Sequence, residues 1–351
     1  MSDTPTNPQP PAAAGKPEAP KGFLVSSAPH LADGATTRRI MFDVVIGMIP
    51  LLIAATLFFK TRAVAMTLVT VAACLATEAV ANYIRGRKQD SLFDGSAIVT
   101  GMILAFSLPP ALDLYMAAIG GAVAIALAKA IFGGLGQNLF NPAMVGRAFL
   151  MICFPAAMGI WTEPVTLHRV GDTRIEGVTM ATPLGASSSL QKGEPSDLPR
   201  MVDLFTGEVS GSLGETSALA ALIGGLYLVF RRTADWRPVV GMLGTAVIFA
   251  VVTHWADPAR FQGPGFHLMS GALLFGAFFI ATDYVGAPIT PLGRWIFGIG
   301  VGTLVMLIRL FGAYPEGVMF AILIMNSLTP LIERWTVPAP FGGHVPAQAA
   351  K

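Results

Sequence analysis

The feature that most constrains this chain is a succession of ten apolar runs, each close to the length that crosses a bilayer. The runs cover residues 40–59, 63–84, 95–110, 113–133, 142–160, 214–231, 237–254, 266–284, 293–312 and 316–333. Only 13% of the residues are charged, whereas soluble domains carry about a quarter. We therefore predict an all-α membrane protein of about ten transmembrane helices in a lipid bilayer, and no nucleic-acid partner.

Basic residues in the short connecting loops predict the orientation of these spans. The loops of one side contain most of them: Arg38, Arg39, Arg85, Arg87, Lys88, Arg231, Arg232, Arg237, Arg294 and Arg334. The short loops of the opposite side contain Lys60, Arg62 and Arg260. Because basic loops tend to stay in the cytoplasm, we expect both termini to be cytoplasmic and residues 161–213 to be periplasmic.

Composition divides the chain into five segments. Residues 1–37 are rich in Pro, Ala, Ser and Thr and lack an apolar core of the signal-peptide type, so we expect a disordered cytoplasmic tail. A first five-helix half at 38–160 and a second at 214–336 flank the polar loop 161–213. Residues 337–351 form a second cytoplasmic tail.

A faint internal repeat relates the two halves. Three pairs of segments align in the same order: residues 96–107 with 271–282, the run from Lys129 with the run from Arg309, and Asn141 with Asn326. Gly-rich apolar segments also align by chance, but the shared order favours a true repeat. Because five spans per half is an odd number, we predict two inverted repeats, an arrangement that places a site near the bilayer midplane.

A Gly-rich polar segment, residues 133–142, leads into the fifth apolar run. It contains Gln137, Asn138 and Asn141, which are equally suited to satisfying a broken backbone and to contacting a ligand. Pro142 suits the first turn of the helix that follows. The segment follows no predicted strand and lacks the GxGxxG pattern, so it is not a nucleotide-binding fingerprint.

Four charged residues lie inside or at the ends of predicted spans: Glu78, Lys129, Arg309 and Asp283. A charge at membrane depth faces a cavity, pairs with another charge or extends to the interface. For Asp283, which ends the eighth run, a capping role and a functional role are both open.

The remaining serine, glutamate, cysteine and histidine residues predict structural roles and no catalytic or metal site. Ser212 and Glu215 match a capping box at the start of the sixth span. Cys74 and Cys153 lie in apolar runs without CxxC spacing, so we expect buried thiols and no metal site. No catalytic triad is visible, and we expect the five scattered histidines at the surface or the membrane interface.

Together these motifs resemble the NqrB/RnfD family of flavin-carrying membrane subunits. The resemblance covers about residues 38–336, with matching motifs in the runs 94–106, 136–143, 214–217, 281–283 and the segment around Asn326. The modest length and short first tail look like the D-type subunit of the Rnf ferredoxin:NAD oxidoreductase. The NqrB-type subunit of the sodium-pumping quinone reductase is longer.

The resemblance implies a covalent flavin. The family attaches FMN through a phosphoester to the last threonine of a pattern similar to Asp-x-x-(Ser/Thr)-Gly-Ala-Thr. The matching run here places FMN on Thr182, with Glu176, Thr179 and Ala181 as motif residues. Glu176 stands where the family has Asp, and Met180 stands where it has Gly.

Local chemistry agrees with Thr182 as the acceptor. A flavin transferase must reach the hydroxyl, so the residue should lie outside the body of a helix. Ala181 is small and leaves access, and Pro183 favours an extended backbone at Thr182. Without the resemblance, a threonine in a polar loop would carry little weight.

The implied function is that of a subunit in a redox-driven ion-translocating complex of the bacterial inner membrane. The resemblance implies partner subunits of the C, B, G, A and E types and allows a second, non-covalent flavin, riboflavin, without assigning residues to it. The chain itself lacks NAD, ferredoxin and iron–sulphur motifs, so we expect a translocase subunit and not a complete enzyme. Neither Na⁺ nor H⁺ is favoured as the transported ion. The alternatives are a passive channel or secondary transporter of urea-transporter-like architecture, an NqrB-type subunit, and a structural scaffold.

Overall fold

The computed structural model describes residues 36–338, except 87–88, 165–179, 313 and 315. Over this part of the chain the regular elements are helices. Five of them are long and apolar enough to cross a membrane: α1 (Thr37–Phe59), α2 (Thr61–Ile84), α10 (Trp236–Ala256), α13 (Pro291–Phe311) and α14 (Val318–Thr336). The prediction of an all-α, multi-span membrane protein is therefore confirmed.

Shorter apolar helices occupy other predicted spans: α3 (Ser96–Phe106), α4 (Leu114–Ile125) with its π-helical continuation η2 (Ala126–Ala130), α5 (Pro142–Cys153) and α9 (Ala218–Phe230). α3 has 11 residues and is about 16 Å long, roughly half of a bilayer core. The predicted runs 95–110 and 142–160 are longer than the helices they form, because prolines follow each helix end. The 3-10 turn η1 (Gln89–Phe93) precedes α3, and α6 (Pro155–Met158) follows α5.

The eighth predicted span, 266–284, is not one helix. It consists of α11 (Pro264–Met269), α12 (Leu273–Phe275) and the π-helical turn η4 (Gly276–Ile280). The break lies at Ser270, whose backbone is extended, and at Gly271, whose φ is +65°. The backbone amide of Ala272 donates to Glu316 Oε2 (3.0 Å), so a distant carboxylate satisfies a group that the break exposes.

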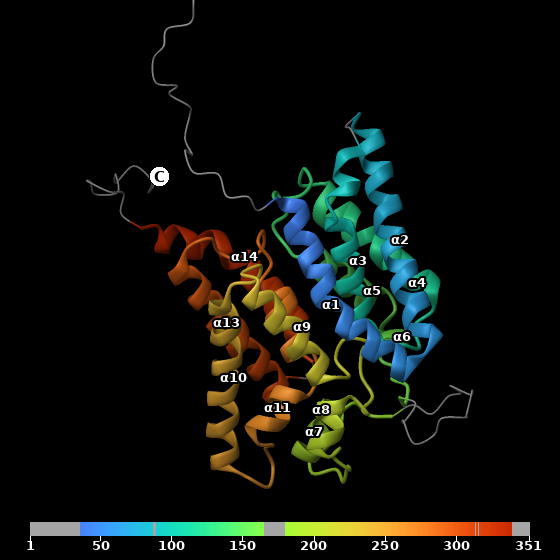
Figure 1. The fold of residues 1–351 in the computed structure, drawn as a ribbon. Helices are drawn as coiled ribbons and strands as arrows, with labels where there is room; N and C mark the ends of the chain where they lie inside the picture. Colours follow the sequence, from blue (N-terminus) through green and yellow to red (C-terminus); the bar gives the residue numbers. More distant parts are fainter. Residues whose placement is uncertain (1–35, 87–88, 165–179, 313, 315, 339–351) are drawn as a thin grey trace, which may run out of the picture. The chain divides into compact units, whose positions relative to one another are not determined.

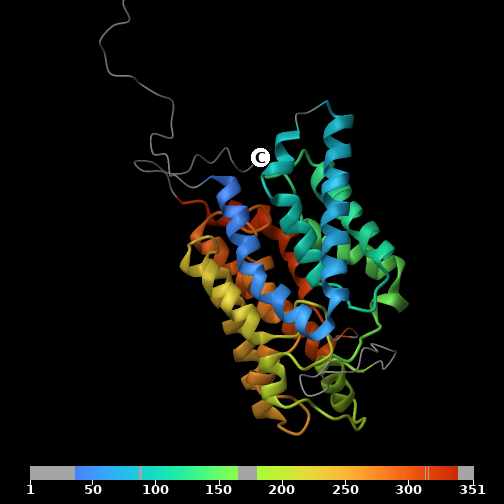
Figure 2. The ribbon, with the colours of Figure 1, turned by 45° about the vertical axis from the view of Figure 1, so that its right-hand side comes forward.

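Each half packs its helices in a comparable order (Figures 1 and 2). In the first half α2 packs against α3 and α4, and α4 packs against α5. In the second half α10 packs against α13, and α13 packs against α14. The five-plus-five inverted repeat stays a prediction.

The two halves meet along α1 and α9, which pack against each other through glycine. A Cβ atom added to Gly224 would lie 1.9 Å from the carbonyl oxygen of Gly47. The two backbones are therefore in direct contact, and no side chain separates them. We call this contact the glycine seam.

The short helices of the two halves also meet. The rings of Phe106, the last residue of α3, and Phe275 in α12 lie edge to face with centroids 6.2 Å apart. The backbone amide of Gly214 donates to the carbonyl of Phe106 (2.7 Å). Irregular backbone before α9 thus packs on the end of α3, in the interior of the protein.

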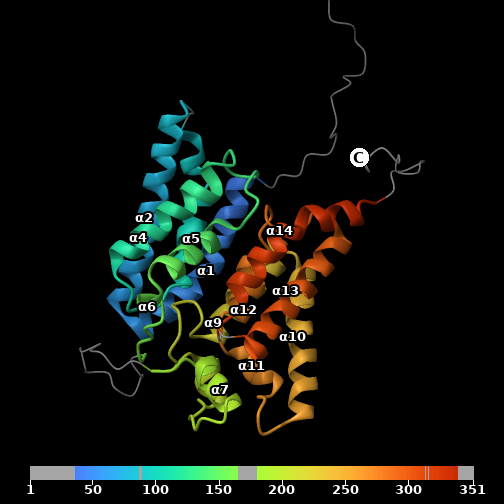
Figure 3. The same cartoon turned by 180° about the vertical axis from the view of Figure 1, so that it is seen from behind.

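The interval 161–213 is not only a loop. It contains α7 (Pro183–Gln191) and α8 (Met201–Thr206), which lie beside α11 (Figure 3). A small core of Leu184, Leu204, Val209 and Phe266 holds α7 and α8 on α11. α7 is thereby fixed at one end of the second half. The predicted tails lie almost entirely outside the described residues.

Candidate functional site

Thr182 is the N-cap residue of α7. Its backbone is extended (φ −66°, ψ 157°), as Pro183 at the first helical position predicts, and its Oγ1 accepts a hydrogen bond from the Gly185 amide (3.1 Å). A Cβ atom added to Gly185 would stand 3.2 Å from this oxygen, so the glycine leaves room around it. The half-buried hydroxyl therefore lies at a helix N-terminus, where backbone amides favour a negative charge.

The residues before Thr182 are anchored at two points. The carbonyl of Ala181 accepts a hydrogen bond from Ser210 Oγ (2.8 Å), and the amide of Met180 donates to the carbonyl of Trp161 (3.1 Å). Ala181 and Met180 are exposed, which leaves the approach to the hydroxyl open. Thr179 and Glu176, the other motif residues, lie outside the described residues.

A pocket of about 270 Å³ adjoins Ala181 and Pro183 on either side of the hydroxyl. Apolar side chains that line it are Met180, Leu198 and Val209. Glu163, Asp197 and Glu208 add acidic groups. The pocket therefore presents apolar and acidic side chains next to Thr182.

A second polar site lies between α5 and α14. The Asn141 side chain caps α5, and its Nδ2 donates to Asp283 Oδ2 (3.3 Å). With its amide turned so that both ends are satisfied, Asn326 accepts from the Asn141 backbone amide (2.9 Å) and donates to the Ile322 carbonyl (2.8 Å). The two asparagines that the repeat aligned are thus brought together. Asp283 accepts from Asn141 and also from the Val285 amide (3.3 Å), so it has the predicted capping contact together with a contact to the asparagine pair.

Asn141 and Asp283 border a narrow cleft of about 80 Å³ between the halves. Asn138, Lys129 and Thr282 also line it, and the buried Asn138 Oδ1 has no hydrogen-bond partner among the described residues. A buried acceptor without a donor is uncommon and indicates a site for water or a ligand.

Lys129 and Glu78 form a buried ion pair. Lys129 Nζ lies 2.7 Å from Glu78 Oε1 and 2.6 Å from Ser96 Oγ, and both charged side chains are at most 6% exposed. Of the options left open by the sequence, pairing is therefore the correct one. A second pocket, of about 250 Å³, reaches this pair from the side of Arg85.

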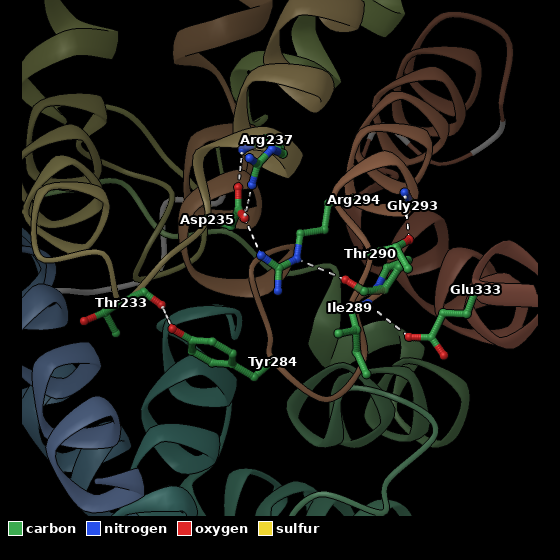
Figure 4. A network of polar contacts seen from close by, with 10 residues as sticks. Thr233, Asp235, Arg237, Tyr284, Ile289, Thr290, Gly293, Arg294 and Glu333 are labelled. Atoms are coloured by element: carbon green, nitrogen blue, oxygen red, sulfur yellow. Dashed lines mark hydrogen bonds and ion pairs between the residues drawn. The ribbon is translucent and has the colours of Figure 1, made fainter. Parts of the chain in front are cut away.

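Polar contacts tie the loops at the Arg-rich end of the second half (Figure 4). Asp235 accepts from the Arg237 amide (2.8 Å) and side chain (2.9 Å), and it also pairs with Arg294. Burial raises the pKa of the Asp235 carboxyl, but the hydrogen bonds from Arg237 and Arg294 outweigh it, so the pKa lies below its usual value. The Tyr284 hydroxyl donates to the Thr233 carbonyl nearby.

Three sequence predictions are wrong. Ser217, not Ser212, caps α9, because its hydroxyl accepts from Ala220 (3.2 Å) while Glu215 turns away to pair with Arg147. His267 is buried, since it belongs to α11, which packs against α8 and α10. Cys153 is exposed because α5 ends there, whereas Cys74 is buried as predicted.

The sequence analysis missed the partners of two buried arginines. Arg147 Nη1 lies 3.6 Å from Glu215 Oε1, and Arg309 Nη2 lies 3.4 Å from Glu316 Oε2. Glu316 stands seven residues after Arg309 and begins the last run, which was the available signal. No group of three or more His, Cys, Asp or Glu side chains suited to a metal occurs among the described residues.

The comparisons with known proteins agree with this architecture. A family model described as "NQR2, RnfD, RnfE family" matches residues 24–342. The chain is 43% identical to the D subunit of the Na(+)-translocating ferredoxin:NAD(+) oxidoreductase complex of Acetobacterium woodii, over 91% of this chain and 95% of the relative. It is 40% identical to the D subunit of the proton-translocating complex of Clostridium ljungdahlii, over 91% and 96%. The chain therefore belongs to the NQR2, RnfD, RnfE family.

Proposed function

We propose that this protein is the D-type membrane subunit of an ion-translocating ferredoxin:NAD oxidoreductase complex and that it carries FMN on Thr182. Relatives that cover more than nine-tenths of the chain are named as D subunits of such complexes. Its partners are then the other subunits, of the C, B, G, A and E types, together with a flavin transferase that modifies it.

The observation that carries the flavin proposal is the position of Thr182. Its hydroxyl caps α7, so a phosphoryl group esterified there would lie at the helix N-terminus, near the amides of Leu184 and Gly185; Pro183 contributes no amide hydrogen. The adjoining pocket offers an apolar wall to a ring system. The isoalloxazine ring supplies the redox chemistry when bound, and the chain supplies position and electrostatics.

Riboflavin is the second flavin that the family resemblance allows. The cleft between the halves is lined by polar groups that could contact it. Asn138, Asn141 and Asp283 offer amide and carboxylate groups beside apolar residues of both halves. The cleft has room for only a few water molecules, so its walls would have to move apart for a ring to enter.

The proposal also covers the orientation of the chain in the membrane and the free energy needed to move an ion. The basic loops favour cytoplasmic termini, with α7 on the periplasmic side of a bacterial inner membrane. Moving one elementary charge against 100 mV costs about 2.3 kcal/mol, a scale that a redox step can supply. The two relatives are named for different cations, so their names do not decide between Na⁺ and H⁺.

Acid precipitation of protein made beside its flavin transferase tests both flavins. We expect one FMN in the washed pellet, located by mass spectrometry on the peptide with Thr182, and riboflavin in the supernatant. Thr182→Ala should lose the pellet flavin. Thr182→Asn is the matched control, because asparagine keeps a helix cap but offers no hydroxyl. A flavin that stays on the Thr182→Asn polypeptide would exclude Thr182 as its site, and an empty supernatant would remove riboflavin from the proposal.

A further inference from the structure

Four charged side chains with little exposure form two neighbouring ion pairs close to α7, and one of these pairs joins the two halves. Arg147 of α5 pairs with Glu215 before α9 (3.6 Å), and Arg309 of α13 pairs with Glu316 before α14 (3.4 Å). The four side chains are between 0% and 17% exposed. Glu215 and Glu316 lie close enough to interact electrostatically. We call these four residues the bridging cluster, in which two carboxylates stand between two guanidinium groups.

Glu215 is the member of this cluster whose hydrogen bonding is incomplete. Within the described chain its Oε1 has no hydrogen-bond partner, and neither do the hydroxyls of Ser212 and Thr216, which are 0% and 1% exposed. Ser212 lies beside the carboxylate without a well-formed hydrogen bond. Buried polar atoms are nearly always paired, so three neighbouring exceptions indicate a polar site that can hold a water molecule, an ion or a proton.

The charges around Glu215 favour a proton over a metal cation. The Arg147 guanidinium already occupies one side of the carboxylate and repels a second cation. A proton instead joins the carboxylate as an O–H bond, and the Ser212 and Thr216 hydroxyls can accept from it. Arg309 and Glu316 face the site from α13 and the start of α14, and buried His267 faces it across Arg309.

The bridging cluster touches the helix that begins at Thr182. A Cβ atom added to Gly271 would lie 2.2 Å from Glu316 Oε2 and 2.5 Å from Leu184 Cδ1. Both atoms lie where a Cβ atom would stand, so the absence of a side chain at Gly271 lets Glu316 approach the second residue of α7. Because Leu184 is apolar and the Glu316 side chain is only 17% exposed, a charge that arrives at the start of α7 is weakly screened at the cluster.

We propose that Glu215 takes up one proton when negative charge arrives at α7 and releases it when that charge leaves. A hydronium ion of the surrounding water gives up the proton, which forms an O–H bond on the Glu215 carboxylate and leaves a neutral water molecule behind. The electron that brings the charge is delivered and removed by redox carriers of the complex, so Glu215 itself is neither oxidised nor reduced. This role rests on the proposed function, which supplies the electron.

Infrared difference spectroscopy of the whole purified complex, reduced minus oxidised, tests this inference. We expect a carbonyl band of a protonated carboxylic acid that shifts in D₂O and is lost in Glu215→Gln. Glu194→Gln changes an exposed carboxylate in the same way and should leave the band in place. A band that survives Glu215→Gln, or one that responds to Na⁺ and not to D₂O, overturns the proposal.

A second variant keeps the test decisive if Glu215→Gln does not assemble. Ser212→Ala combined with Thr216→Val leaves the carboxylate and removes both hydroxyls, so the band should move in frequency. An unmoved band contradicts the proposed site. Covalent flavin is measured on the same samples, so its absence from Thr182 counts against the proposed function alone. A pH titration of the band in the oxidised complex still reports on Glu215 in that case.

Discussion

At the scale of single residues, Thr182 has two separate properties. Its hydroxyl caps a helix, which explains a threonine at this position without any chemistry. Its place at a helix N-terminus, beside a pocket and after the exposed Ala181, is also what a phosphoryl acceptor needs. Thr182→Asn is informative because it separates these two properties.

Asp235 gives a pH-dependent prediction at the same scale. Its pKa is lower in the folded protein than in an unfolded chain, so its contribution to stability is complete above about pH 4 and is lost as the pH falls through the folded-state value. We expect Asp235→Asn to lower the midpoint of thermal unfolding at pH 7 and to differ less from the wild type in acid.

Thermal unfolding in detergent, measured at several pH values, checks this expectation. Asp113→Asn is the matched control, because Asp113 is exposed and its side chain makes no capping hydrogen bond to α4. Equal differences between Asp235→Asn and the wild type at pH 7 and in acid would contradict the argument.

At the scale of elements, the hydrophobic pattern predicts where apolar helices form but not where they break. α1, α2, α10, α13 and α14 follow from long apolar runs. The break inside the eighth run depends on Glu316, which meets the Ala272 amide from 44 residues further along the chain. The hydrophobic pattern of residues 266–284 contains no information on this contact with Glu316. The same limit explains the buried His267 and the Arg147–Glu215 pair, since both depend on which helices pack together.

Some features of the candidate site could be predicted from the sequence, and others could not. The proposed acceptor Thr182, its extended backbone and the neighbouring proline were available from the sequence, and so was the correspondence between Asn141 and Asn326. The helix that Thr182 caps was not, because the segment after it is short and rich in serine, which favours a loop. Its apolar residues become a helix face only when Leu184 packs against Phe266.

Gly271 gives the prediction for the broken helix. Its φ of +65° costs an L-residue roughly 1–2 kcal/mol, and a Cβ atom would also collide with Glu316 and Leu184. We expect Gly271→Ala to destabilise the protein by about 2 kcal/mol or more, seen as a lower midpoint of thermal unfolding. Gly263→Ala is the control, since its backbone has a φ of −70° and no atom lies within 4 Å of the added carbon. If both variants unfold at the same temperature, the break does not depend on Gly271.

At the scale of the whole molecule, two halves with similar packing are joined along the glycine seam. We expect Gly224→Ala to destabilise the protein by roughly 1–3 kcal/mol or prevent its accumulation, because its Cβ atom would overlap the Gly47 carbonyl. Gly244→Ala in α10 meets no atom within 4 Å and should be neutral or slightly stabilising. Membrane yield and unfolding temperature of the two variants provide the comparison. A Gly224→Ala protein as stable as Gly244→Ala would contradict the close contact.

The glycine seam also limits how this subunit can work. Transporters built from repeats commonly expose their site to each side in turn by rocking one half against the other. Here two backbones touch at the seam without side chains that could slide or change rotamer, so rocking would have to separate main-chain atoms. Movements at the ends of the short helices α3 and α12 would leave this backbone contact intact, and α1 and α9 would then keep a constant distance from each other.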